Sequence, residues 1–144
     1  MTGLSAGNYS HKFQGNAIDI NTTPYFIGGV GTMTLTAATT GFTLTGVQQA
    51  VALPMGNQVT EITYVTYLLT GTVVQQAGQN IWDADITFTQ DVTSNPVVMK
   101  GQFALVPAGS WDKYWAVSTG SEIIHGANVA PTEAVMGTIR RMPS

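Results

Sequence analysis

The stretch that decides the fold is Gly31-Thr-Met-Thr-Leu-Thr-Ala-Ala-Thr-Thr-Gly-Phe-Thr-Leu-Thr-Gly46. Apolar and threonine side chains alternate strictly in residues 31–37 and again in residues 41–46, as they do in a β-strand that buries one face. The segment Ala38-Thr-Thr-Gly41 between them ends in glycine and is typical of a turn. The sequence therefore predicts a β-hairpin at this place.

Residue composition and the alternation of apolar side chains predict further strands. A β-rich run at 62–74 is apolar on both faces, which indicates a strand covered on two sides. Shorter runs with strand character are residues 81–90, 97–106, 114–119 and a closing strand at 134–142, unless Pro131 opens a single helical turn. No segment has the period of an amphipathic helix, so an all-β protein is predicted.

Seven to nine strands joined by short turns favour a single antiparallel up-and-down β-barrel of about eight strands. Closure removes the open sheet edges, which a chain with only 9% charged residues has few means of protecting. A β-sandwich is the alternative. No linker or change of composition divides residues 1–144, so one domain is expected.

Composition excludes several classes of function. The chain has eight acidic and five basic residues and a net charge of -3, and its one adjacent pair of cations is Arg140 and Arg141, so nucleic-acid binding is not expected. The absence of cysteine excludes disulfides and cysteine-ligated zinc. Residues 1–10 lack a signal-peptide pattern, and no run approaches about 20 apolar residues, so we expect a cytoplasmic protein without a membrane span.

Two carboxylates lie two residues apart at Asp83 and Asp85, and a strand turns both to the same face. If they faced inward, each would raise the other's pKa and the pair could perform acid–base chemistry. If they faced outward, they would be solvated. The opposite face of this run is apolar throughout, from Trp82 to Phe88, and this alternation favours the outward arrangement.

The interior of such a barrel is expected to bind an apolar small molecule. The residues expected to line the ligand site are Trp82, Phe88, Met99, Phe103 and Trp115. Tyr64 and Trp115 are expected to close one end of it, and Tyr64 is one of two candidate catalytic residues. The other is His125, which follows Glu122-Ile-Ile next to a glycine loop where a barrel mouth would lie.

The two histidines and one glycine-rich run are the other candidate sites in the sequence. His11 and His125 are the two histidines, and either could act as a general base near neutral pH. They lie far apart without an acidic partner at ligand spacing, so no metal site is expected. The run Gly28-Gly-Val-Gly31 leads into a strand rather than a helix, so we interpret it as a bend or bulge and not as a phosphate cradle.

Two resemblances accompany these patterns, and both belong to the calycin-like small barrels. The hairpin at 31–46, Tyr67-Leu-Leu-Thr-Gly71, Trp82, Gly101-Gln-Phe103 and Trp115 resemble avidin-type barrels. Met99 stands where those proteins have a tryptophan, so this resemblance implies a barrel and not biotin binding. The segment from Trp115 to Ala127 is similar to the Ala-Val-x-Gly-Gly-Thr-Gly segment of allene oxide cyclase and dirigent-like barrels, which implies a cofactor-free cyclase.

Two functions therefore stand side by side. The first is a cofactor-free cyclase or isomerase that shapes a polyketide- or terpenoid-like substrate, mainly by holding it in one conformation. The second is a non-catalytic barrel that binds a small ligand or assembles with copies of itself. A homo-oligomer is expected in either case, because the run at 62–69 is apolar on both faces and the surface carries few charges.

Overall fold

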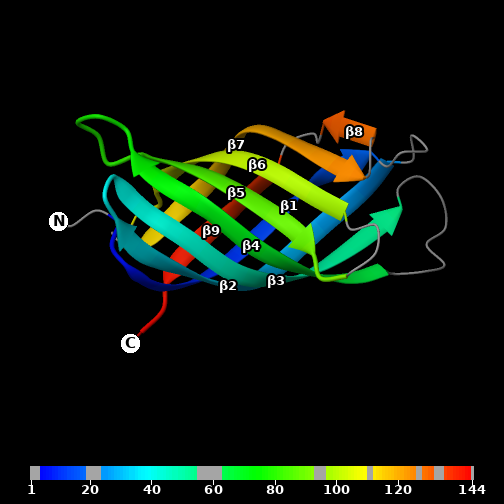
Figure 1. Cartoon of the computed structure of the whole chain (residues 1–144), viewed down its shortest axis with the longest axis horizontal. Coiled ribbons are helices and arrows are strands. Elements are labelled where there is room, and N and C mark those ends of the chain that lie inside the picture. Colours follow the sequence, from blue (N-terminus) through cyan, green and yellow to red (C-terminus); the bar gives the residue numbers. More distant parts are fainter. Residues whose placement is uncertain are drawn as a thin grey trace.

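The computed structural model describes residues 4–18, 24–54, 63–92, 97–109, 112–125, 128–131 and 135–143. Within these ranges it contains nine strands and no helix (Figure 1). The strands are β1 (Gly7–Ile18), β2 (Pro24–Ala38), β3 (Gly41–Pro54), β4 (Thr63–Gln75), β5 (Trp82–Gln90), β6 (Val97–Pro107), β7 (Lys113–His125), β8 (Asn128–Pro131) and β9 (Val135–Arg141). None of the described segments is a helix long and apolar enough to cross a bilayer.

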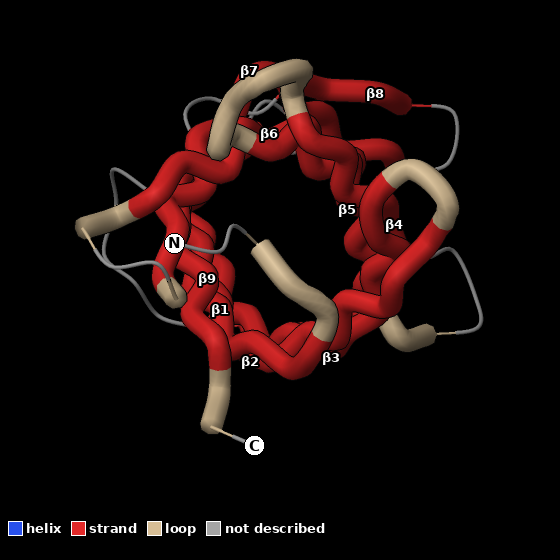
Figure 2. The backbone as a smooth tube through the Cα atoms, turned by 90° about the vertical axis from the view of Figure 1, so that its left-hand side faces the viewer, coloured by secondary structure: helices blue, strands red, loops and turns tan. Residues whose placement is uncertain are grey.

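Eight of these strands close into an antiparallel barrel. Neighbouring strands pair in the order β1–β2–β3–β4–β5–β6–β7–β9, and β9 pairs back onto β1. Figure 2, which looks along the barrel, shows the ring of strands. The short strand β8 lies outside the ring and pairs with the second half of β7. The predicted eight-stranded barrel is confirmed, and the β-sandwich is wrong.

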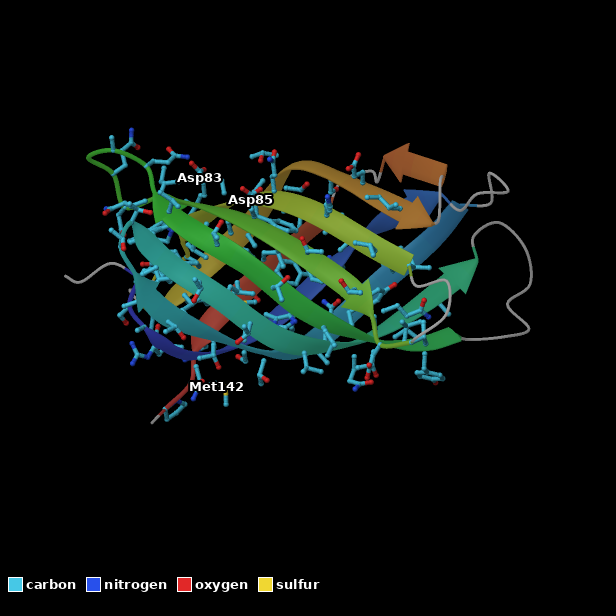
Figure 3. The ribbon with its side chains drawn as sticks, viewed as in Figure 1. Asp83, Asp85 and Met142 are labelled. Carbon is cyan, nitrogen blue, oxygen red and sulfur yellow. The ribbon has the colours of Figure 1, made fainter. Side chains whose placement is uncertain are left out.

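Alternating side chains give every strand an inner and an outer face. On β5 the apolar residues between Trp82 and Phe88 are buried, whereas Asp83 and Asp85 are exposed on the outside (Figure 3). The outward arrangement of the two aspartates is therefore confirmed, and paired carboxylates do not face the interior. The same alternation operates in the predicted hairpin, where threonines face outward along β2 and β3.

The N-terminal segment closes one end of the barrel. Residues 4–6 cross its mouth (Figure 2), and Leu4 is buried there. The hydroxyl of Tyr9 donates a hydrogen bond to the carbonyl oxygen of Ser5 over 2.7 Å, and the guanidinium of Arg141 donates to the Ser5 hydroxyl. This end, which also carries the hairpins β2–β3, β4–β5 and β6–β7, is called the closed end below.

The glycine run in β2 is neither a bend nor a bulge, so that expectation is wrong. Residues 28–31 pair with β1 and β3 without a shift of register. A methyl group at Gly31 would collide with the carbonyl oxygen of Val47, and one at Gly29 would lie 2.6 Å from the side chain of Gln48. Glycine is required at 29 and 31 because neighbouring strands place a buried side chain and backbone against these two positions.

Candidate functional site

The half of the interior nearer the closed end is filled with side chains. Phe13 packs at its centre, with its ring centroid 5.8 Å from that of Phe88 and 5.1 Å from that of Phe103. Trp82 packs against Phe42 at 5.4 Å, further toward the closed end. These contacts are those of a close-packed core.

A cavity of about 60 Å³ lies in the other half of the interior. Residues of the second half of β1 and the first half of β2 form part of its wall. Residues of β3, β4, β6 and β9 form the rest. Its wall is mainly apolar and contains no charged residue: Phe13, Gln14, Ile27, Gly28, Gly29, Gln48, Ala50, Val51, Val65, Tyr67, Val97, Met99 and Val135. The segments that connect the strands at this end lie outside the described residues.

Gln48 brings a polar group into this wall. Its side chain is only 4% exposed, lies over Gly29, and finds no hydrogen-bond partner among the described residues. Unlike the ring nitrogens of His11, its amide nitrogen and oxygen are not among the fully buried polar atoms of the described chain, so a water or another small molecule in the cavity can pair with them. The partner expected for Gln48 is a molecule in the cavity.

His11 lies beside this cavity in the packed half. It pairs across strands with Gly31, which in turn pairs with Gln48, and its ring lies 5.3 Å from that of Phe13. Neither ring nitrogen has a hydrogen-bond partner in the described chain. Burial lowers the pKa of His11 to about 4, so the imidazole is neutral at pH 7. The expectation of a base that titrates near neutral pH is therefore not met by His11.

Tyr67 supplies the second polar group of the cavity wall. It is half-buried on β4, and burial raises the pKa of its hydroxyl, which therefore stays protonated and able to donate a hydrogen bond. Tyr64, the tyrosine that sequence reasoning selected, lies on the opposite face of the same strand and is 76% exposed. Its predicted place at the end of the interior is wrong, because three residues along a strand reverse the face.

The other candidate residues divide into three groups. Met99 lines the cavity, whereas Trp82, Phe88 and Phe103 point inward but belong to the packed half. Trp115 is 48% exposed on the outside, where the ammonium of Lys113 lies 5.5 Å from its ring, so its predicted inward position is wrong. The backbone of His125 ends β7 opposite Val97, and its side chain lies outside the described part of the structure.

Comparisons with known proteins do not assign the chain to a family. No family model and no curated protein matches the chain. The structure of the S-type phycobiliprotein lyase CPES from Guillardia theta aligns with 97% of this chain and 89% of that chain, at 9% identity and a TM-score of 0.36. A likeness of this size carries no information about ligand or activity. The resemblances to avidin-type and allene oxide cyclase-type barrels are not confirmed.

Proposed function

We propose that this chain is a binding barrel for a small, mainly apolar molecule, which it holds in the cavity beside Gln48. The observation that carries the proposal is the Gln48 side chain, which is 4% exposed, has no hydrogen-bond partner in the described chain and lies in a mainly apolar cavity wall. Sites of this composition, apolar with a few fixed polar groups, are typical of small-molecule binding.

The size of the cavity limits the ligand. Pockets for drug-sized molecules usually have volumes of about 300–1,000 Å³, whereas this one measures about 60 Å³. The ligand therefore consists of few heavy atoms, or it inserts one narrow end. A folded polyketide or terpenoid chain is too large for this space, and this favours binding over the shaping of such a substrate.

The methionines allow a direct test by NMR. With ¹³C-labelled methionine methyl groups, a titration with 1-hexanol should move the signal of Met99, which lines the cavity. The signal of Met136, which is 49% exposed on the outer face, serves as the control in the same spectrum. Saturable movement of Met99 with Met136 unchanged supports the proposal. An unchanged Met99 signal up to the solubility limit of 1-hexanol overturns it.

A filling substitution separates cavity binding from surface binding. Ala50 lines the cavity, so Ala50→Leu should weaken 1-hexanol binding at least tenfold. Thr45→Leu adds a similar side chain on the exposed outer face of the same strand and should leave binding unchanged. Equal binding by both variants would place the alcohol elsewhere and would contradict the proposed site.

Cofactor-free cyclisation or isomerisation remains a second candidate for the same cavity, and Tyr67 is the residue that favours it. A protonated phenol in an apolar wall can donate a hydrogen bond to a carbonyl oxygen and stabilise charge that develops there. Tyr67→Phe removes this donor and keeps the ring. It should abolish turnover of any carbonyl substrate that the cavity accepts, whereas a chain that only binds should retain its ligand.

A further inference from the structure

We propose that the cavity selects an uncharged ligand whose polar end both donates and accepts hydrogen bonds, as a primary amide or a hydroxyl does, and that it rejects the carboxylate of the same size. This inference rests on the proposed binding function and names the chemical class of its ligand. The most specific member of that class is a primary amide at the end of a short alkyl chain.

Every lysine and arginine of the chain is accounted for, and none of them borders the cavity. All five lie in the described residues: Lys12, Lys100, Lys113, Arg140 and Arg141. Three of them are exposed on the outer wall, and the other two are held by Trp115 on the outside and by Ser5 at the closed end. A carboxylate that entered the cavity would therefore be desolvated without an ion-pair partner, which is strongly unfavourable.

The buried polar groups on the described strands are also uncharged. They include the side chains of Gln48, which lines the cavity, and His11, which lies behind it, as well as single polar atoms of Asn16, Trp82 and Tyr114. Gln48 offers two amide N–H donors and a carbonyl acceptor, and the Tyr67 hydroxyl adds a further donor. A primary amide can exchange two hydrogen bonds with Gln48 at once, and a hydroxyl can exchange one in either direction. Such a ligand would satisfy the orphaned amide without bringing charge into the apolar wall.

Two probes of nearly identical shape test the selection. Hexanamide and hexanoate share their alkyl chain and differ in the charge of the terminal group. In titrations of the full chain at pH 7, followed by the Met99 methyl signal, hexanamide should bind at least tenfold more tightly than hexanoate. Equal affinities, or tighter binding of hexanoate, would overturn this inference while leaving cavity binding intact.

The role of Gln48 has its own control. Gln48→Leu keeps the approximate size of the side chain and removes its hydrogen bonds, so hexanamide should bind about tenfold more weakly, whereas 1-heptene, which cannot hydrogen-bond strongly, should bind no more weakly. Gln49→Leu, on the exposed face of the same strand, should change neither affinity. Unchanged hexanamide binding in Gln48→Leu would refute the polar anchor. If none of the probes moves Met99, the proposed function itself fails.

Discussion

His11 shows how strongly this interior departs from water. Its ring is 2% exposed, and neither nitrogen is hydrogen-bonded to the described residues. Because burial penalises the charged imidazolium, the folded protein binds the proton only at a pH of about 4, whereas an unfolded chain binds it near 6.5. The unfolded state therefore carries more protons than the folded state between these two values, and the folding stability depends on pH in that window.

We predict that His11 makes the protein less stable as the pH falls from about 6.5 to about 4. Above pH 6.5 the neutral His11 costs no folding stability, and by pH 5 the free energy of unfolding has fallen by about 2 kcal/mol. His11→Leu should remove this part of the pH dependence and stabilise the protein at pH 5. Urea unfolding of wild type and variant at pH 5 and 7.5 measures the pH dependence and the stabilisation. Because the carboxylates are the same in the two proteins, the difference between them reports on His11. Parallel pH profiles of wild type and variant would contradict the prediction.

The glycines of β2 offer a second test at the level of single residues. Gly31→Ala should destabilise the protein by about 2 kcal/mol or more, because its methyl group meets the backbone of Val47, which cannot move aside. Gly28→Ala is the matched control from the same run: the nearest atom to its methyl group is the carbonyl oxygen of Phe13 at 3.9 Å. It should be neutral or stabilise by up to about 1 kcal/mol. Thermal unfolding distinguishes the two.

Among the larger elements, the N-terminal segment depends on one of two adjacent arginines. Arg141 binds the Ser5 hydroxyl and lies 6.0 Å from the Tyr9 ring, whereas Arg140 is exposed and makes a 4.0 Å ion pair with Asp112. Arg141→Ala should lower stability by about 1–2 kcal/mol, and Arg140→Ala by less than about 0.5 kcal/mol. Amide hydrogen exchange of residues 4–9 should accelerate in the first variant alone. Equal exchange in both variants would show that Arg141 does not hold the segment.

Strands whose apolar and polar residues alternate clearly could be predicted from the sequence. In β5, the best case, this alternation correctly predicted that Trp82 faces inward and Asp83 outward. β1 was not recognised, although Tyr9 and Phe13 alternate with polar residues, because a histidine occupies the inward position between them. The second half of β7 was missed as well, because Ser118-Thr-Gly-Ser121 carries no apolar alternation; this half pairs with β6 and, in a local hairpin, with β8.

The site was harder to predict than the fold. Met99 lines the cavity, and its place in a ligand site stays a prediction. Because β4 is apolar on both faces, its own sequence could not tell whether Tyr64 or Tyr67 points inward. Gln48 did leave a signal: it continues the inward alternation of Phe42 and Leu44 along β3. The boundary between the packed core and the cavity depends on how all eight strands close into a ring, so it cannot be predicted from the sequence of one strand.

The outer surface of the whole molecule supports self-association, which stays a prediction. Val47 and Leu68 lie opposite each other on β3 and β4 and are 43% and 45% exposed. We expect a dimer or larger assembly, and Leu68→Lys should shift it toward the 15.2 kDa monomer in sedimentation velocity. Thr70→Lys adds the same charge on the same face of β4 and should have a smaller effect. A monomeric wild type at high concentration would contradict the prediction.

Both ends of the described chain lie at the closed end (Figure 1), where the amide of Met142 donates to the carbonyl oxygen of Asn8 over 2.8 Å. A short glycine–serine linker can therefore join them, and the chain can be cut open instead in the exposed turn at Gly78. We predict that this circular permutant still gives a strand-rich circular dichroism spectrum and the Met99 response to 1-hexanol. An unfolded permutant would show that the β4–β5 connection itself is needed. A folded one means that strand pairing defines the barrel, whichever strand comes first along the chain.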